Sequence, residues 1–258
     1  MRSALLFLSL VCVGGPLPAI AQAASAITLP APQKTGGAPL MDTLARRATS
    51  RAFDADAPDL TPQQLSDLLW AAFGINRPDG KRTAPSALNV QEVDIYVLLR
   101  QGAFVYNARK HALLPVGGSG SPPGNSDESS SGKPETGPPD LRALGGTQAF
   151  VERAALTLVY VTDFSRMGRM GEGLPAAEAT ALRRETAAFC VGAVAQNASL
   201  YCASEGLITG VRMSFDRAKL GAALGLRSNQ WISLAQSVGQ IKNRNCPPGK
   251  KEDPEIHF

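Results

Sequence analysis

The sequence predicts an α+β fold in which a central antiparallel or mixed sheet surrounds one long buried helix. Short β-prone runs at 93–99, 104–106 and 112–116 follow one another with only turn-like residues between them, which is typical of an antiparallel meander. Residues 176–205 have the pattern of one long helix. From Ala187 to Leu200 this helix is apolar or small nearly all round, which indicates the centre of a core. The absence of regular alternation between strands and helices argues against a doubly wound nucleotide fold.

A shorter helix precedes the meander. Thr61 supplies an N-cap, Pro62 a first-turn proline and Gln64 the glutamine of a capping box. Apolar residues then follow at helical spacing: Leu65, Leu68, Leu69, Ala72 and Phe73. We expect Gly74 to end this helix in a left-handed conformation.

The remaining elements lie in the last 110 or so residues of the chain. Ala155–Thr162 is expected to be a buried strand, and Gly206 is placed to end the long helix. Asp216 can cap a short helix that runs to Leu224 and is ended by the following glycine. A last strand is expected at Trp231–Val238.

The N-terminus has the features of a secretory signal. Arg2 gives a short positive region, Ala4–Val13 an apolar stretch, and Ala21-Gln22-Ala23 a cleavage site of small residues. The apolar stretch is shorter than the roughly 20 residues that a membrane-spanning helix needs, and no later segment is long enough. We therefore expect residues 1–23 to be a signal peptide, the mature protein to be exported, to the periplasm, and no membrane span to remain.

Composition divides the rest of the chain. Residues 24–39 are rich in Ala, Pro, Gly and Thr without periodicity and are expected to form a flexible arm. Residues 117–140 are rich in Gly, Pro and Ser and are expected to be a disordered surface insertion. The main domain then covers 40–245, and 246–258 form a C-terminal tail.

Several classes of function are disfavoured by composition. The formal charge of +4 comes from scattered basic residues, which does not indicate a nucleic-acid partner. The only histidines are His111 and His257, so a histidine-based triad or a metal site is not expected. Cys190 and Cys202 lie twelve residues apart in one helix, too far for a disulfide, and we interpret them as core residues. Whether Cys246 is free stays open.

A candidate phosphate site lies early in the main domain. In the segment Arg47-Ala48-Thr49-Ser50-Arg51, two guanidinium groups flank one hydroxyl at every second position, and an extended backbone would point all three to one side. Such a group suits a phosphate monoester, because the arginines offer charge-assisted hydrogen bonds and the hydroxyl donates another. The alternative is a solvated basic edge.

A second candidate is the loop Pro85-Ser86-Ala87-Leu88-Asn89-Val90-Gln91, between the capped helix and the meander. Its hydroxyl, amide and backbone groups could hydrogen-bond the polar edge of a flat heteroaromatic ring. The alternative is an ordinary connection between a helix and a strand.

Taken in order, these motifs resemble the nitroreductase family of flavoenzymes, especially its branch of SagB-type, azoline-forming dehydrogenases. The resemblance spans about Leu44–Arg244 and includes an Arg-x-Ser-x-Arg/Lys-x-Phe pattern, with threonine here in place of serine. It continues through further motifs at Leu68–Arg77, Pro85–Gln91, Gly192–Leu200 and Glu205–Gly210.

The resemblance implies an FMN site. The phosphate would be bound by Arg47, Thr49 and Arg51, and completed by Lys242 and Arg244 near the C-terminal end of the domain. The flavin itself would be lined by a loop and a strand end: Pro85, Ser86, Ala87, Asn89, Met213 and Ser214.

In the family, a backbone amide at a Glu-Gly pair faces flavin N5, and Met213-Ser214 stands at that place here. The Ser214 backbone could therefore take this role, but the glutamate is absent. Positive charge near the pyrimidine edge of the ring could come from Arg77, Lys81 or Arg82, and the alternative is that these are solvated loop charges.

The function that the resemblance implies is that of an FMN-dependent oxidoreductase, usually a homodimer with FMN at the subunit interface. A small-molecule donor would reduce FMN, and hydride would pass from N5 to a nitroaromatic, a quinone or a related organic acceptor. Export limits which molecule could donate electrons to FMN, because pyridine nucleotides are scarce outside the cytoplasm. The alternatives are an exported flavin-binding protein without turnover, and a cofactor-free interaction module.

Overall fold

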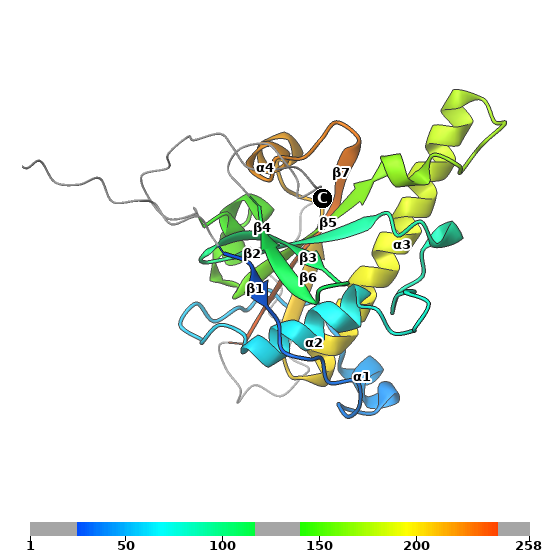
Figure 1. Cartoon of the computed structure of the whole chain (residues 1–258). Helices are drawn as coiled ribbons and strands as arrows, with labels where there is room; N and C mark the ends of the chain where they lie inside the picture. Colours follow the sequence, from blue (N-terminus) through cyan, green and yellow to red (C-terminus); the bar gives the residue numbers. More distant parts are fainter. Residues whose placement is uncertain (1–24, 117–139, 242–258) are drawn as a thin grey trace, which may run out of the picture.

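The computed structural model describes residues 25–116 and 140–241 (Figure 1). The expected signal peptide, nearly all of the expected insertion and the C-terminal tail lie outside these ranges. Within them, the chain forms one sheet with helices packed on it, so the α+β prediction is confirmed.

The sheet of the described residues has seven strands, and all neighbouring strands pair antiparallel in the order β1-β4-β3-β2-β5-β7-β6. The predicted meander corresponds to the sequential neighbours β2, β3 and β4. The bounds are β1 Ile27–Thr28, β2 Val93–Leu99, β3 Gly102–Asn107, β4 Ala112–Pro115, β5 Leu156–Asp163, β6 Ile208–Arg212 and β7 Gln230–Gly239.

Helices cover both faces of this sheet. The α-helices are α1 Leu40–Arg46, α2 Pro62–Phe73, α3 Ala176–Ser204 and α4 Arg217–Ala223. Short 3₁₀ turns lie at η1 Ala87–Asn89, η2 Arg142–Gly145, η3 Ala149–Arg153 and η4 Phe164–Met167.

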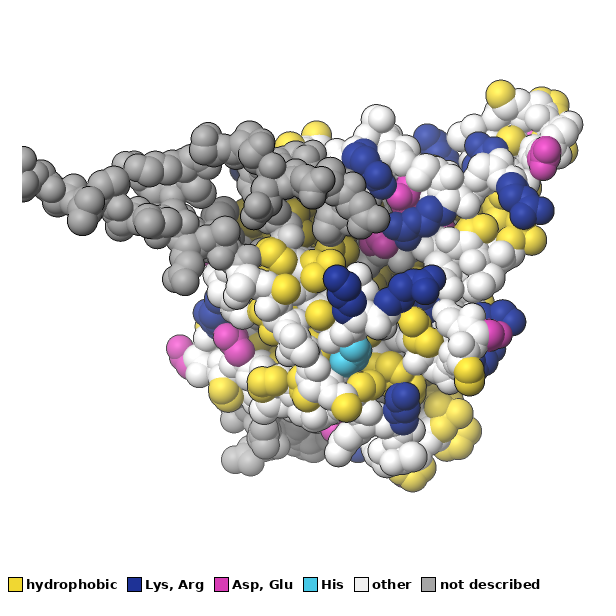
Figure 2. All heavy atoms as spheres, viewed as in Figure 1, with side chains coloured by type: hydrophobic (Ala, Val, Ile, Leu, Met, Phe, Trp, Pro, Cys, Tyr) yellow, Lys and Arg dark blue, Asp and Glu magenta, His cyan; other side chains and the backbone are white. Residues whose placement is uncertain are grey.

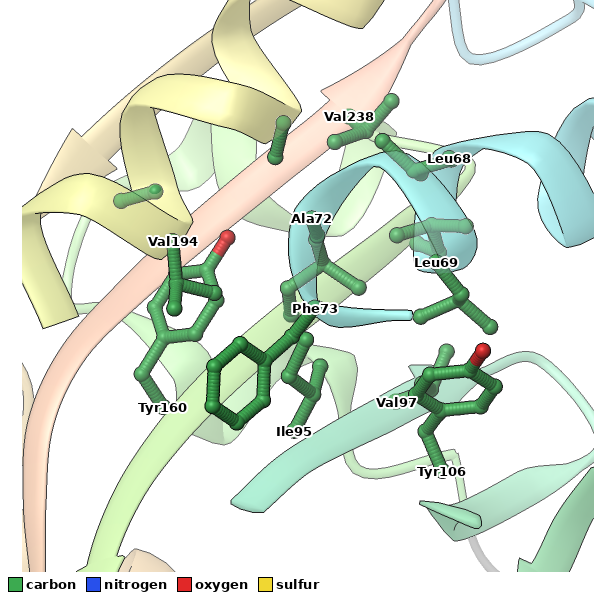
Figure 3. Packing of buried hydrophobic residues seen from close by; sticks show 14 of the residues in the cluster. Leu68, Leu69, Ala72, Phe73, Ile95, Val97, Tyr106, Tyr160, Val194 and Val238 are labelled. Carbon is green, nitrogen blue, oxygen red and sulfur yellow. The ribbon is translucent and has the colours of Figure 1, made fainter. Parts of the chain in front are cut away.

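The central strands are buried on both sides, because successive side chains of a strand point to opposite faces and each face is covered. On β2, Ile95 and Val97 belong to the core beneath α2 and α3, whereas Tyr96 and Leu98 pack on the other face with α4. Figure 3 shows the first of these cores, with α2 side chains such as Phe73 directed at the strands.

Local capping chemistry explains where the helices begin and end. The Thr61 side chain accepts a hydrogen bond from the Gln64 backbone, and the Gln64 side chain accepts one from the Thr61 backbone, so the predicted capping box is confirmed. After α3, Gly206 has φ +69° and Leu207 N–H donates to the Cys202 carbonyl at 2.8 Å. This is the glycine-terminated helix end that the sequence predicts.

Gly74 differs from the prediction. It has φ −74° and ψ 166°, which is extended rather than left-handed. A side chain at this position would collide with Trp70, since an added Cβ would lie 2.7 Å from the Trp70 Cα. A glycine is therefore required because the Gly74 backbone lies too close to Trp70 for a side chain, and not because of the backbone conformation.

Helix α3 is buried along one face and not all round. Val191, Val194 and Ala198 lie in the core, but Phe189 on the same helix is 71% exposed. Cys190 and Cys202 are buried without a disulfide, as predicted, and burial raises the pKa of the Cys202 thiol to about 12.

The N-terminal segment is integrated into the fold instead of forming the expected flexible arm. Its strand β1 pairs with β4, and Leu29 is buried in the core. The Pro30 carbonyl accepts a 2.7 Å hydrogen bond from Ser66 Oγ, and Gln33 N–H donates to Asp67 at 2.7 Å. Composition could not indicate this, because the partners come from distant parts of the chain.

This docking makes a stability prediction. Leu29→Ala should lower the free energy of unfolding by about 2–3 kcal/mol, because it removes buried methyl groups and leaves a cavity. The exposed Lys34→Ala is the matched control and should change little. Urea denaturation measures both, and equal values for the two variants would contradict the docked segment.

Candidate functional site

A hollow of about 180 Å³ lies at the open edge of the sheet, between α3, β6 and the segment that follows α1. Three pairs of residues from these elements line it: Arg47 and Thr49, Gln196 and Ser199, and Thr209 and Gly210. It thus contains two members of the predicted phosphate group.

The segment 47–50 reaches this edge because it runs alongside β6. Thr49 forms a parallel bridge with Thr209, and Ser50 N–H donates to the Thr209 carbonyl at 3.0 Å. The two segments lie in contact here, since an added Cβ at Gly210 would lie 3.4 Å from the Ser50 carbonyl oxygen. Arg47 is placed by α1, where its N–H donates to the Thr43 carbonyl.

Arg51 does not line the hollow. The chain turns sharply after Ser50, where Phe53 N–H donates to the Arg51 carbonyl at 2.9 Å and the Phe53 ring enters the core. The Arg51 guanidinium carbon lies 5.7 Å from the centre of the Phe150 ring instead. The predicted alternation therefore holds for Arg47 and Thr49 only, because burial of Phe53 interrupts the extended backbone.

The floor of the hollow is a layer of buried hydrogen bonds centred on Gln236. Its amide donates to Ser199 Oγ at 3.1 Å and to Thr209 Oγ1 at 2.9 Å, and its oxygen accepts from Tyr160 Oη at 2.5 Å. Thr209 Oγ1 in turn donates to the Ser237 carbonyl. The polar groups under the hollow are thus held in place, which makes the floor rigid.

The loop 85–91 is strained. Leu88, Asn89 and Gln91 all have φ between 51° and 54°, a left-handed conformation that residues other than glycine adopt at a cost of about 1–3 kcal/mol each. Leu88 at its tip is 72% exposed. Strain of this kind persists only where surrounding contacts fix the backbone.

Those contacts include Ser86, whose hydroxyl is directed inward. It donates to Glu92 Oε2 and accepts from Gln91 N–H, both at 2.7 Å. The Glu92 carboxyl is fully buried, and its Oε1 has no hydrogen-bond partner among the described residues. Within this chain, the Ser86 hydroxyl therefore gives its proton to Glu92.

Two arginines hold the end of the loop. Arg82 Nε donates to Gln91 Oε1 and its Nη1 to the Phe73 carbonyl, each at 2.9 Å, while Arg166 Nη1 donates to the Gln91 carbonyl at 2.8 Å. Burial lowers the pKa of Arg82, but this guanidinium remains charged at any ordinary pH. Arg82 is thus a structural cation of the loop.

The loop lies against a second, more open hollow of about 390 Å³, lined by Asp79, Gly80, Asn89, Gln91 and Arg109 among others. No residue lines both hollows. The phosphate candidates and the loop candidates therefore form two separate sites within one chain.

The other predicted site residues are distributed as follows. Met213 and Ser214 follow β6 directly and are exposed, and the Ser214 carbonyl accepts from Thr147 N–H. Pro85 is exposed and Ala87 is half-buried. Lys242 and Arg244 lie outside the described residues.

His111 lies close to a serine but does not form a nucleophilic pair. Ser66 Oγ and His111 Nε2 are 2.7 Å apart, and Tyr106 Oη lies 3.0 Å from His111 Nδ1. However, Ser66 is fully buried and donates its proton to the Pro30 carbonyl. Burial lowers the pKa of His111, which fits a neutral ring with a packing role.

Other classes of site were not found in the parts of the chain that the structure describes. They contain no group of three or more His, Cys, Asp or Glu side chains able to hold a metal ion. No helix in these parts is both long and apolar enough to cross a membrane. Figure 2 shows Lys and Arg side chains dispersed over the visible face rather than collected into one patch.

Comparison with known proteins identifies the family. The model of the nitroreductase family matches residues 44–240, which is most of the chain. The chain belongs to the nitroreductase family. This confirms the family to which the sequence motifs pointed. No curated protein matches the sequence.

Solved structures agree with this nitroreductase assignment. A protein from Ralstonia eutropha described as a nitroreductase has 35% identity and a TM-score of 0.69, with 90% of this chain and 98% of that chain covered. The match to the Escherichia coli microcin synthetase complex (15% identity, TM-score 0.57) covers 92% of this chain and 85% of that one. The match to the NADPH:FMN oxidoreductase of Vibrio harveyi (18% identity, TM-score 0.50) covers 85% of this chain and 79% of that one. The microcin synthetase and Vibrio harveyi structures show the shared fold.

The Ser86–Glu92 hydrogen bond can be tested in this nitroreductase-family domain. Ser86→Ala should lower the free energy of unfolding by about 1–3 kcal/mol, because it removes the hydroxyl that donates to a buried carboxyl. Combining it with Glu92→Met should recover the share of that loss that comes from the buried carboxyl, whereas the Gln91 N–H, which loses its Ser86 acceptor, keeps its own share. Chemical denaturation gives these values, with exposed Ser228→Ala as control. A loss of the same size in the double variant would show that the Ser86–Glu92 bond is not its cause.

Proposed function

We propose that this chain is an FMN-dependent oxidoreductase that passes hydride through flavin N5 to a nitroaromatic, a quinone or a related organic acceptor. The observation that carries the proposal is the hollow at the sheet edge, which both Arg47 and Thr49 line. Family membership supports it, as does the fold shared with an NADPH:FMN oxidoreductase.

The residues present fit a phosphate ester. Arg47 offers a charged donor and Thr49 a hydroxyl, the pair that suits a phosphate oxygen cluster. Gly192 on α3 leaves room there, since an added Cβ would have no atom within 4 Å. A space of about 180 Å³ admits the phosphate end of FMN, and the rest of the cofactor would extend beyond it.

The protein's part is binding and orientation, while the bound flavin supplies the redox chemistry. Arg47 would offset part of the phosphate charge. The hydrogen bonds of Gln236 hold α3 and β6 at a constant separation, so the hollow keeps its shape when it is loaded. The backbone at Met213-Ser214, directly after β6, is the position we assign to flavin N5.

Two further properties belong to the same proposal. The chain would be exported to the periplasm by residues 1–23, and its electron donor would be a small molecule. It would belong to the SagB-type branch, on the motifs described for the sequence.

We further propose a homodimer with FMN at its interface. Apolar side chains of α1 and α3 lie exposed in this chain: Leu40, Met41, Leu44 and Phe189. Figure 2 shows hydrophobic side chains at the surface where α1 lies. Exposed apolar groups of this kind mark association surfaces. Within one chain, the 85–91 loop and the phosphate hollow are separate. In a dimer, the 85–91 loop of one copy would lie at the phosphate hollow of the other copy.

Arg47 provides the direct test of the cofactor site. Arg47→Ala should raise the Kd for FMN by about 10–100-fold, the loss expected for a charge-assisted hydrogen bond. Arg51→Ala is the matched control and should change this Kd by less than about threefold, because its side chain does not line the hollow. Quenching of flavin fluorescence measures both.

Riboflavin separates a phosphate contact from a general loss of fold, since it lacks the phosphate. Its affinity should be the same in the wild type and in Arg47→Ala. If FMN binds both proteins equally well, the phosphate assignment is wrong.

An exported flavin-binding protein without turnover remains the second candidate, and one observation favours it: an exposed methionine, Met213, stands where the family carries a glutamate. Purified protein loaded with FMN distinguishes the two. Steady-state reduction of a quinone or nitroaromatic by the photoreduced protein supports the oxidoreductase, whereas bound flavin that is never reoxidised by an acceptor supports the binding protein.

The proposed homodimer can be tested by placing a charge on its expected interface. Phe189→Glu places a charge on the exposed apolar surface and should convert the protein to a monomer, as measured by light scattering after gel filtration. Lys219→Glu, an exposed charge reversal on α4, should leave the dimer intact. A wild-type monomer at micromolar concentration would refute the homodimer without bearing on the FMN hollow of one chain.

A further inference from the structure

The open hollow beside the loop 85–91 has a size that suits a small molecule. Its volume is about 390 Å³, and small-molecule sites typically measure about 300–1,000 Å³. Three segments of the chain meet around it: residues 78–80, the loop residues Asn89, Val90 and Gln91, and Arg109 from the turn between β3 and β4. Pro78 and Val90 give it apolar walls, and its other side chains are polar.

Arg109 offers a free charged donor to this hollow. Its side chain is exposed. Among the residues that the structure describes, it forms neither an ion pair nor a hydrogen bond. The nearby Arg82 differs, because its Nε donates to Gln91 Oε1 and its Nη1 to the Phe73 carbonyl. Arg109 is therefore the arginine at this hollow whose donors remain for a ligand.

The carboxylate that lines the hollow, that of Asp79, already has a cation. Asp79 Oδ2 lies 2.8 Å from Lys81 Nζ, and Asp79 Oδ1 accepts a hydrogen bond from the Lys81 N–H at 3.2 Å. The hydrogen bond from the Lys81 side chain lowers the pKa of the Asp79 carboxyl, so this group is ionised and paired near neutral pH. A cationic ligand would have to displace Lys81 to bind here.

Positive charge also lies behind the hollow, on Arg82. Burial is the main cause that lowers the pKa of Arg82, and the positive charge of Arg109 lowers it further. An anion bound by Arg109 would reduce this repulsion, whereas a cation would add to it. The electrostatics of the hollow therefore favour a negatively charged ligand.

The loop wall of the hollow is fixed by Gln91. Its N–H donates to Ser86 Oγ at 2.7 Å, its carbonyl accepts from Arg166 at 2.8 Å, and its side-chain amide donates to the Gly80 carbonyl at 3.1 Å. The same amide donates to Asn89 Oδ1 at 3.2 Å, which leaves the N–H groups of the Asn89 side chain as donors. A wall that is fixed before binding suits a ligand that accepts hydrogen bonds, because little further ordering is needed.

We propose that this hollow binds a small aromatic carboxylate, with the acid group on Arg109 and the ring against Pro78 and Val90, and so selects acceptors that carry an acid. The planar guanidinium matches the two oxygens of a carboxylate. As a binding site the hollow is independent of any reaction. Its use to select an acceptor rests on the proposed oxidoreductase function.

The binding experiment compares para-nitrobenzoate with para-nitrobenzamide, which share a nitroaromatic ring and differ in charge. Both are titrated calorimetrically into the purified, oxidised protein without a reductant, so that no turnover occurs. The acid should bind at least about fivefold more tightly than the amide, a value between those of an exposed ion pair and a charged hydrogen bond. Added salt should reduce this preference, because salt screens an exposed charge. Equal affinities, or no binding of either compound, would overturn the site.

Variants locate the acid group. Arg109→Gln should remove the preference for the acid without changing the melting temperature, because this side chain has no ion pair or hydrogen bond among the described residues. Lys110→Gln is the matched control and should retain the preference, since Lys110 is an adjacent exposed cation that does not line the hollow. A preference that survives in Arg109→Gln, or that Lys110→Gln loses to the same extent, would place the acid elsewhere and overturn the proposal.

Turnover distinguishes this inference from the proposed function. With photoreduced, FMN-loaded protein, Arg109→Gln should raise the KM for para-nitrobenzoate by about fivefold and leave the KM for para-nitrobenzamide and the Kd for FMN unchanged. Reduction of both compounds with an unchanged ratio of KM values would refute selection by this hollow. Reduction of neither compound would refute the oxidoreductase, while the calorimetric result would still decide the binding site.

Discussion

The side chain of Gln236 connects the elements on which the candidate cofactor site depends. From the middle of β7 it binds Tyr160 on β5, Ser199 on α3 and Thr209 on β6. Each bond lies in the interior, where an unmade hydrogen bond costs about 1–3 kcal/mol, so the four elements cannot shift independently. The hollow at the sheet edge keeps its shape because its floor is this layer.

The arginines near the two sites have different roles, although they look alike in the sequence. Arg47 lines the hollow and is available to a ligand, whereas Arg82 and Arg166 bind the strained loop through the Gln91 side chain and carbonyl. Arg51 and Arg212 face the other side of the sheet beside Phe150. Position relative to the sheet, and not charge alone, therefore decides which guanidinium groups can meet a phosphate.

The loop 85–91 shows how conformational strain is retained. Three residues in left-handed conformation would relax if the loop were free, but inward hydrogen bonds from Ser86 to Glu92 and outward ones from Arg82 and Arg166 hold both of its ends. The result is an apolar residue, Leu88, presented at a fixed and exposed tip. A flexible connection between a helix and a strand would not need this many restraints.

Features set by neighbouring residues could be predicted from the sequence alone. The capping box of Thr61 and Gln64, the helix end at Gly206, the strands of the meander and the family motifs all follow from contacts a few residues apart or from side-chain periodicity. The nitroreductase family was therefore accessible from the order of the motifs.

Other features were decided only by tertiary structure. The direction of Arg51 follows from burial of Phe53, the inward turn of the Ser86 hydroxyl from Glu92, and the docking of residues 27–33 from β4 and α2. Gln236 and Arg212 gave no signal in the sequence, because a polar residue in a strand shows its role only through partners on other strands. In each case the deciding contact joins residues that the fold, and not the local chain, brings together.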